Sequence, residues 1–370
     1  MVLLIGNYPP DQQQSMLRFG TMMLEGLTAA GVSAELIQPE PIFGNFRLAG
    51  AFVAKWLAYI DKFVLFPLRL RARLRATPAL VHICDHSNAR YAQQIRGPSV
   101  VITCHDFLAV RGALGEETDT PASATGRWLQ RWILAGLRKA DALACDSQAT
   151  LEDARKLVVR GTGRPTLHLI LLGLSHPYQR MKRAEALAKS EEVTVPFVLH
   201  VGSNLRRKNR EAVLRIFASC RAKWDGQLVF VGERLSDSLN AEARELGIAD
   251  RIVQLGNCSN EKLEALYNCA TALVYPSRFE GFGWPIIEAQ ACGCPVVCSS
   301  LEPMAEIAGA GALLHHPDDE AGFAQDLLRL TDAAEHADWS ARALKNAQRF
   351  TTERMIANYR ELYRELSPAC

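Results

Sequence analysis

Residues 275–300 read YPSRFEGFGWPIIEAQACGCPVVCSS, and this is the most informative stretch of the chain. It follows a short apolar run at 272–275 and continues as a glycine-containing loop, an apolar helical segment and a second apolar run, PVVC. Short runs rich in Val, Ile and Leu that alternate with helical segments are typical of parallel sheets with helices on both faces. The stretch therefore predicts an α/β protein.

The same alternation extends in both directions from this stretch. The expected strands are Val2–Ile5, Ala34–Ile37, Leu80–Cys84, Val100–Thr103, Ala142–Cys145, Leu167–Leu171, Pro196–Val201, Leu228–Val231, Ile252–Leu255, Ala272–Tyr275, Pro295–Cys298 and Ala312–His315. Between 173 and 195 the alternation gives way to a charged, proline-containing stretch, which is the best candidate for a domain boundary.

We therefore expect two doubly wound, Rossmann-like domains that face each other across a cleft, because clefts between domains are common ligand sites. The expected parts are a first domain at 1–180, a linker at 181–195, a second domain at 196–348 and a C-terminal segment at 349–370. Apolar residues recur in the last segment close to a helical period, so we expect a helix there that packs back on the first domain.

Composition excludes several classes of protein. The 370 residues suffice for about two domains, and a net charge of +2 provides no general field that would hold nucleic acid. The N-terminal sequence lacks the features of a signal peptide and no apolar run is long enough to span a bilayer, so we expect a cytoplasmic protein. The ten cysteines include no CxxC pair, which argues against a disulfide framework and a zinc site.

Two carboxylates stand on either side of the glycine loop in the opening stretch. Glu280 lies in the loop, and Glu288 falls in the first turns of a helix expected to begin near Trp284. Gly281 and Gly283 allow the backbone to approach a ligand closely, and a helix N-terminus attracts anions. The two carboxylates are expected to face one pocket and to bind sugar hydroxyls beside a diphosphate. Alternatively, the glycines serve only a turn, and Glu288 is a favourable acid at a helix start.

The spacing of these carboxylates resembles the E-x7-E signature of family-4 retaining glycosyltransferases, with GFGWPII between them and EAQACGCPVV continuing the match. The resemblance implies the GT-B fold, with a nucleotide sugar held mainly by the C-terminal domain. It further implies that Glu280 contacts the hydroxyls of the transferred sugar, that Glu288 contacts the ribose, and that the Gly281–Phe282–Gly283 backbone lies near sugar and phosphate.

The segment HVGSNLRRKN at 200–209 also resembles this family. An expected strand ends at Gly202 and a basic cluster follows, at the carboxyl end of a parallel strand where open α/β sheets bind ligands. Arg207 and Lys208 would stabilise a diphosphate leaving group. Many members have Arg where this chain has Ser203, and Arg206 or Arg207 is expected to compensate. The alternative is a solvated basic turn.

Polar residues follow three expected strands of the first domain. His105, followed by Asp106, resembles the histidine that the family places next to the donor sugar. Gly6 and Asn7 stand where the family has its acceptor-side loop, although the usual double glycine is absent. Asp85 and His86 are candidates for acceptor recognition, with a purely structural role as the alternative.

The segment 52–75 combines aromatic and aliphatic residues with a run of arginines, RLRARLR. Such a segment suits the surface of an anionic membrane, where it would meet a lipid-linked acceptor. It equally suits a crossover helix whose apolar side packs on the sheet.

The resemblance implies a metal-independent hexosyltransferase that uses no cofactor and moves mannose, glucose or a similar sugar from a nucleoside diphosphate to a hydroxyl acceptor, as in polysaccharide biosynthesis. The acceptor would be a glycan, a lipid-linked molecule or a small molecule. A nucleotide-sugar epimerase or hydrolase, or a non-catalytic nucleotide-sugar binding protein, remains as an alternative. A nicotinamide dehydrogenase is disfavoured because no G-x-G-x-x-G follows the first strand.

Overall fold

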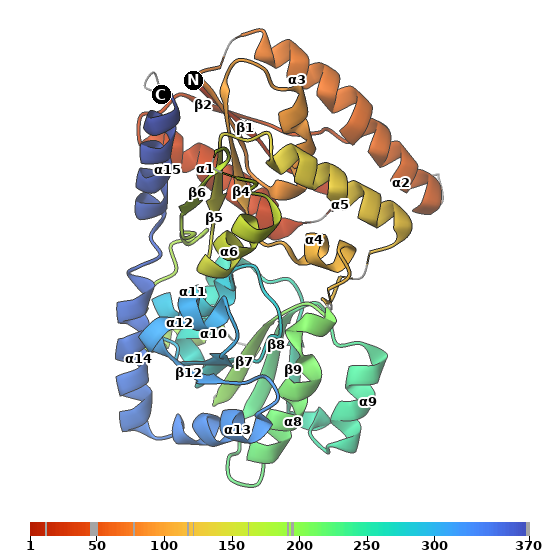
Figure 1. The fold of residues 1–370 in the computed structure, drawn as a ribbon. Helices are drawn as coiled ribbons and strands as arrows, with labels where there is room; N and C mark the ends of the chain where they lie inside the picture. The colour runs from red at the N-terminus through yellow and green to blue at the C-terminus, as the bar shows by residue number, and fades with distance from the viewer. Residues whose placement is uncertain are drawn as a thin grey trace. The chain divides into compact units, whose positions relative to one another are not determined.

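The computed structural model describes the chain except for residues 12, 45–50, 77, 117, 121, 162, 191, 194–195 and 368–370, and except for the side chains of 51–55. The described chain forms two compact units, one made of 1–175 and 352–370 and the other of 176–351. Figure 1 shows both units with their helices and strands.

The first unit is built on a six-stranded parallel sheet with the strand order β2-β1-β3-β4-β5-β6. Its strands are β1 (Val2–Ile5), β2 (Ala34–Ile37), β3 (Leu80–Ile83), β4 (Ser99–Cys104), β5 (Ala142–Cys145) and β6 (Thr166–Leu169). Its helices are α1 (Gln14–Ala29), α2 (Ala51–Ile60), α3 (Phe66–Leu74), α4 (Leu108–Ala113), α5 (Ala124–Leu137), α6 (Gln148–Leu157) and α15 (Thr352–Leu366). A nine-residue 3-10 helix, His86–Gln94, follows β3.

Helices cover both faces of this sheet. On one face, Val81 and Ile83 pack in the same core as Leu70 of α3 and Leu134 of α5. On the other face, His82 binds the hydroxyl of Tyr363 in α15 at 2.6 Å. A Cβ on Gly26 of α1 would lie 2.5 Å from Ile356 of α15, so a glycine permits these two helices to pack closely. The C-terminal helix thus packs within the first unit (Figure 1).

The second unit repeats the architecture with the strand order β12-β11-β10-β7-β8-β9, again entirely parallel. Its strands are β7 (Phe197–Gly202), β8 (Gln227–Gly232), β9 (Ile252–Leu255), β10 (Ala272–Tyr275), β11 (Val296–Ser299) and β12 (Ala312–His315). Its helices are α7 (Arg183–Lys189), α8 (Arg210–Cys220), α9 (Asp237–Glu245), α10 (Asn260–Cys269), α11 (Trp284–Ala291), α12 (Met304–Ala308), α13 (Glu320–Arg329) and α14 (Ala333–Ala347).

The prediction of two Rossmann-like domains is confirmed, and every expected strand is present within two residues of its expected ends. Residues 181–195, expected to be a linker, include α7, which packs against α10 in the second unit and buries Ala186. Seven residues of mixed charge give too little periodicity to indicate a packed helix from the sequence alone.

The helices α2 and α3 are joined by a π-helical turn, Asp61–Leu65. The carboxylate of Asp61 is buried and accepts hydrogen bonds from the hydroxyl of Tyr8 at 2.7 Å and from the backbone N–H groups of Phe43 and Gly44 at 3.0 and 2.9 Å. The neighbouring Lys62 forms an ion pair with Asp11 at 2.9 Å. This turn therefore fastens the helix to the loop that follows β1.

Candidate functional site

Each sheet has one point where the chain reverses its direction of strand addition. In the second sheet the neighbours are β7 and β10, because the chain adds β8 and β9 on one side of β7 and then returns to the other side. In the first sheet the neighbours are β1 and β3. Ligands of open α/β sheets bind beyond the carboxyl ends of the strands at such switch points. The sequence-predicted residues follow the strands at or next to these two points.

At the switch point of the second sheet, Arg207 and Lys208 converge on the carboxylate of Glu280. Lys208 Nζ donates to Glu280 Oε1 at 2.6 Å, and Arg207 Nη1 donates to Glu280 Oε2 at 2.5 Å. The hydroxyl of Tyr275, the last residue of β10, donates to Glu280 Oε1 at 2.8 Å and accepts from Lys208 Nζ at 2.7 Å. Two cations thus surround one carboxylate, so the cluster retains a positive charge that suits an anionic ligand.

The backbone holds this cluster in place from two sides. Arg207 and Lys208 lie in a 3-10 turn that ends at Asn209, whose left-handed φ of 54° is one that Asn tolerates. The amide of Asn209 donates to the carbonyl of Pro276 at 3.1 Å, directly after β10. The backbone N–H of Arg278 in turn donates to the carbonyl of Arg207 at 2.8 Å. The loops after β7 and β10 are therefore fastened to each other.

Burial and charge act in opposite directions on Glu280. Burial alone would raise the pKa of its carboxyl, but the charges of Lys208 and Arg207 and the hydrogen bonds it accepts lower the pKa to about 2. Burial lowers the pKa of Lys208, and the charge of Glu280 opposes that shift. Glu280 is therefore an anion at neutral pH, suited to accept hydrogen bonds from hydroxyl groups and unsuited to donate a proton.

The ion pair predicts a pH dependence of stability. A carboxyl group with a lowered pKa in the folded protein stabilises it above the ordinary pKa of 4.5, and this contribution is lost as the pH falls toward about 2. We expect the difference in the free energy of unfolding between the wild type and Glu280→Gln to shrink by up to roughly 3 kcal/mol across that range. Thermal melts of both proteins between pH 5 and pH 2.5 measure it, and a difference that stays constant would contradict the ion pair.

A buried arginine holds the loops that follow β7 and β8. Arg210, in the first turn of α8, donates to the carbonyl of Gly202 at 2.5 Å, and to the carbonyl of Glu233 and the side chain of Asn204 at 2.7 Å each. Burial lowers its pKa to about 10, which leaves the guanidinium charged at neutral pH. Ser203 lies partly exposed between Gly202 and Asn204. Arg210 therefore fixes the position of the loop that carries Gly202 and Ser203.

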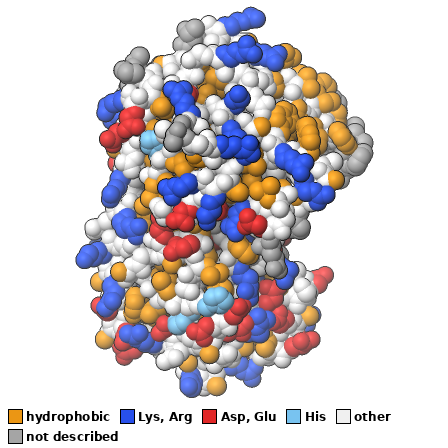
Figure 2. Space-filling model, in the orientation of Figure 1, with side chains coloured by type: hydrophobic (Ala, Val, Ile, Leu, Met, Phe, Trp, Pro, Cys, Tyr) orange, Lys and Arg blue, Asp and Glu red, His pale blue; other side chains and the backbone are white. Residues whose placement is uncertain are grey.

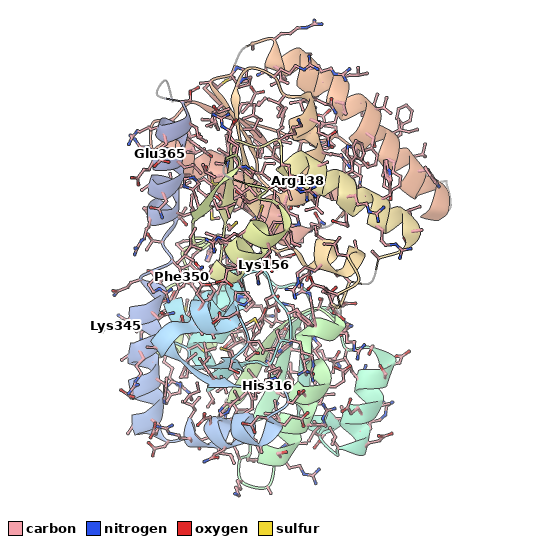
Figure 3. All side chains as sticks on the ribbon, viewed as in Figure 1. Arg138, Lys156, His316, Lys345, Phe350 and Glu365 are labelled. Atoms are coloured by element: carbon pink, nitrogen blue, oxygen red, sulfur yellow. The ribbon has the colours of Figure 1, made fainter. Side chains whose placement is uncertain are left out.

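The glycine loop leads into α11 as expected. Gly283 caps the helix with a φ of 102°, a left-handed conformation that disfavours any side chain, and Pro285 occupies the first turn. Phe282 is buried and its ring packs against that of Phe350, with centroids 5.8 Å apart. Figure 3 shows Phe350 in the segment that follows α14. The loop that contains Gly281 is thus anchored by an aromatic contact.

Glu288 is buried in α11 and accepts a hydrogen bond from the hydroxyl of Tyr267 in α10 at 3.0 Å. The hydrogen-bond partners of the two signature carboxylates therefore differ: Glu280 is held by Lys208 and Arg207, and Glu288 by Tyr267.

In the first unit, the structure brings together the residues that follow β1 and β3. Asn7 Nδ2 donates to Asp85 Oδ2 at 2.5 Å, and Asn88 Nδ2 donates to Asn7 Oδ1 at 3.1 Å. His86 Nδ1 lies 3.2 Å from Asp85 Oδ1. Gly6 precedes this network, and a Cβ there would lie 3.2 Å from Gln38 and Leu36, so the position is crowded. These acceptor-side candidates form one connected polar cluster.

His105 lies beside this cluster at the end of β4. Its Nδ1 is 3.0 Å from Asp146 Oδ2, and its Nε2 is 3.0 Å from the carbonyl of Cys84, the residue before Asp85. Burial alone would lower the pKa of His105, but the hydrogen bond and the charges of Asp146 and Asp85 outweigh it and leave the pKa raised. Both ring nitrogens are thus engaged within the first unit. Asp106 Oδ1 accepts a hydrogen bond from the backbone N–H of Leu108, the first residue of α4, at 2.9 Å.

Several residues that complete these clusters are not indicated by the sequence patterns above, namely Tyr275, Tyr267, Arg210, Asp146 and Asn88. Tyr275 could have been found, because a tyrosine at the end of an apolar strand directly before the glycine loop has its hydroxyl near the loop. Asp146 could be paired with His105 only once β4 and β5 were known to be neighbours.

The two sheets and their switch-point clusters define the fold class, and solved structures agree. The chain has the GT-B fold of glycosyltransferases. It is similar over its whole length to sucrose-phosphate synthase from Thermosynechococcus elongatus, with a TM-score of 0.77, 23% identity, and coverage of 100% of this chain and 99% of that one. It is also similar to HepE from Anabaena, solved in complex with UDP, with a TM-score of 0.75, 16% identity and coverage of 99% and 100%.

Sequence comparisons match part of the chain. The model of the family described as glycosyl transferases group 1 matches residues 181–348. O-antigen chain mannosyltransferase B from Escherichia coli is 32% identical over 162 residues, which are 42% of this chain and 42% of that protein. The chain thus aligns with about two fifths of the length of this curated relative.

Proposed function

We propose that this protein is a retaining, metal-independent glycosyltransferase of the family-4 type. It would transfer a hexose such as mannose or glucose from a nucleoside diphosphate sugar to a hydroxyl of a glycan, lipid-linked or small-molecule acceptor. The observation that carries this proposal is the cluster of Arg207, Lys208 and Glu280 at the switch point of the second sheet. The match to group 1 glycosyl transferases, the mannosyltransferase relative and the UDP complex of HepE support it.

The donor is expected to bind the second unit. Arg207 and Lys208 would contact the diphosphate and stabilise the charge that develops on it as it leaves. Glu280 would accept hydrogen bonds from hydroxyls of the transferred sugar, and Glu288 from those of the ribose. The backbone of Gly202, Ser203 and the loop Gly281–Phe282–Gly283 would approach the phosphates and the sugar.

In the reaction, the bond between the anomeric carbon and the diphosphate oxygen breaks, and a bond to the acceptor oxygen forms on the same face of the sugar. The proton of the acceptor hydroxyl passes to the departing diphosphate, which makes a covalent enzyme intermediate unnecessary. Asn7, Asp85 and His86 would orient the acceptor, and His105 would contact the transferred sugar. Positioning of the two substrates would contribute much of the rate.

The proposed reaction needs no metal ion. The sequence contains no DxD motif, which metal-dependent transferases use to bind Mn²⁺ or Mg²⁺. We expect donor turnover to be unchanged after dialysis against EDTA. Turnover that disappears on dialysis and returns with Mn²⁺ would show that a metal ion is required.

The hydrogen bond between Tyr267 and Glu288 predicts an effect on nucleotide binding. Tyr267→Phe removes the hydroxyl that orients Glu288, so nucleotide affinity is expected to fall about five-fold, in line with ~1 kcal/mol for a hydrogen bond. Calorimetric titration with the nucleoside diphosphate measures it. Tyr359→Phe is a matched control, since it removes a buried hydroxyl that binds Thr103 in the first unit. Equal affinities of both variants would remove Glu288 from the donor site.

The donor is identified by thermal shift with UDP-, GDP- and ADP-sugars, because a ligand that binds only the folded state raises the melting temperature. Product analysis with the stabilising donor then separates the candidate functions. A glycoside with retained anomeric configuration supports the proposal, whereas a free sugar or an epimer supports a hydrolase or an epimerase. Stabilisation without turnover of any acceptor would indicate a binding protein. We propose the cytoplasm as the location.

A further inference from the structure

Four apolar side chains are exposed along the outer side of the helix formed by α2, the π-helical turn and α3. They are Trp56, Ile60, Val64 and Leu68, with exposed fractions of 57, 39, 52 and 56%. The inner side of the same helix is buried in the core through Phe66 and Leu70. These exposed residues are four positions apart, and we call them the apolar stripe.

The π-helical turn places the stripe on one face of the helix. In a regular α-helix a step of four residues drifts by about 40°, so the four residues would wind around the axis. The π-helical turn Asp61–Leu65 has more residues per turn than an α-helix. Its extra residue offsets most of this rotation. The stripe is therefore nearly straight, and Arg71 and Arg75, both exposed, continue it toward the C-terminal end.

A chain of ring contacts extends this apolar surface to α5. Trp56 contacts Tyr59, Tyr59 contacts Phe63, Phe63 stacks on Trp132, and Trp132 contacts Trp128, with successive centroids 5.2 to 5.7 Å apart. Trp128 at the far end is 63% exposed. Figure 2 shows hydrophobic side chains gathered over α2 and α5, with Lys and Arg side chains at their border. Two exposed tryptophans thus stand at the ends of one aromatic row.

The two helical segments that carry this surface contain several basic residues and no exposed acid among the described residues. Asp61 is the only acidic residue in 51–75, it is buried, and the segment 122–140 has none. Among the described residues, Arg69 pairs with Glu40 and Arg73 with Glu35. No ion pair joins Arg71, Arg75, Arg127 or Arg131 to an acid in the part of the chain that the structure describes. Their positive charge is uncompensated on the same side as the apolar stripe.

We propose that this surface, made of the apolar stripe, Trp128 and the four arginines, docks on a bilayer that contains anionic lipids. Tryptophan suits the boundary between headgroups and acyl chains, and each arginine near an anionic surface adds to the binding. The helix would lie in the plane of the interface. Among the described residues no helix has the length and apolarity to cross a membrane.

A second copy of the chain is a poorer occupant. Pairing two such surfaces would bring Arg71 and Arg75 of one copy toward cations of the other, with no exposed acid on either helix to compensate. The surface belongs to the first unit, whereas the donor cluster belongs to the second. The inference goes beyond the proposed function, and vesicle binding can be tested without knowing the donor.

The test is sedimentation of the full chain with vesicles of phosphatidylcholine containing one quarter phosphatidylglycerol, and with vesicles of phosphatidylcholine alone. The wild type is expected to bind the anionic vesicles. Arg71→Glu combined with Arg75→Glu is expected to lower the partition coefficient at least about ten-fold, because two attractive charges become repulsive. The control combines Lys223→Glu with Lys345→Glu, which changes the net charge equally at exposed sites of the second unit and is expected to bind as the wild type does.

Insertion of the tryptophans has its own readout. Lipids brominated on their acyl chains are expected to quench the fluorescence of the wild type, and Trp56→Phe with Trp128→Phe is expected to lose that quenching while the melting temperature is kept. Wild type that stays in the supernatant would overturn the proposal, as would equal binding of both charge variants. A wild-type dimer that ignores vesicles and dissociates on Leu68→Glu would show that the surface joins two copies and would also overturn it.

Discussion

Replacing Glu280 by Gln is expected to lower sugar transfer by about 10²–10³-fold, the range typical of losing one preorganised electrostatic contact in a transition state. The side chain is buried and bound by Lys208, Arg207 and Tyr275, so its position is fixed before any substrate arrives. The amide of Gln keeps the size and one acceptor oxygen but loses the negative charge. The transferred sugar would then lose a negatively charged acceptor at the step in which positive charge develops on it.

The same substitution is expected to leave the affinity for the nucleoside diphosphate unchanged or higher. In the proposed donor site Glu280 would compete with the diphosphate for Lys208 and Arg207, and the neutral amide would release both cations. Lys208→Met, in contrast, is expected to lower both affinity and turnover. Steady-state kinetics and calorimetry with the donor found by thermal shift measure the two effects, and Glu211→Gln, at an exposed site of α8, is the control. Wild-type turnover by Glu280→Gln would refute the proposed role of Glu280.

Gly232→Ala is expected to destabilise the second unit by about 3–5 kcal/mol, because two separate costs add. Gly232 ends β8 with a φ of 111°, a conformation that a side chain makes unfavourable. A Cβ there would also lie 2.4 Å from the carbonyl oxygen of Gly202, which is backbone and is held by Arg210. The strand ends would have to separate, and the loop with Gly202 and Ser203 would move with them.

Gly256→Ala is a suitable control for that prediction. Gly256 follows β9 in the same unit, nothing lies within 4 Å of its virtual Cβ, and its φ is not positive. Chemical denaturation followed by tryptophan fluorescence is expected to show a large loss for Gly232→Ala and little change for Gly256→Ala. Similar midpoints for both variants would mean that the ends of β7 and β8 can separate at little cost.

The sequence predicted the strands well for a physical reason. Strands of a parallel sheet are buried on both faces, so each appears as an uninterrupted apolar run such as VLLI at 2–5 or ALVY at 272–275. The order of the strands could not be obtained in this way, because it depends on which crossovers pack together. The switch points, and therefore the meeting of Lys208 with Glu280 72 residues later, became visible only in the structure.

The candidate site was predictable where a motif contributed several residues at once. Glu280, the glycines and Glu288 lie in one stretch, and their backbone setting in a loop and the start of α11 was as expected. The role of Arg210 could not be predicted, because an arginine at the start of a helix is usually solvated. In the structure its guanidinium donates instead to backbone carbonyls at the ends of β7 and β8. The π-helical turn could not be predicted either, since π-helical turns have no simple residue pattern.

The buried carboxylate of Asp61 limits which segments can be exchanged between related proteins. It ties the backbone at Phe43 and Gly44 to Tyr8, so the segment between β2 and β3 and the loop after β1 share one anchor. A chimera can contain a foreign segment that is not compatible with the residue at position 8. Either the hydroxyl or the carboxylate would then be buried without a hydrogen-bond partner. Grafts of this segment should therefore transfer Tyr8 and Asp61 as a unit.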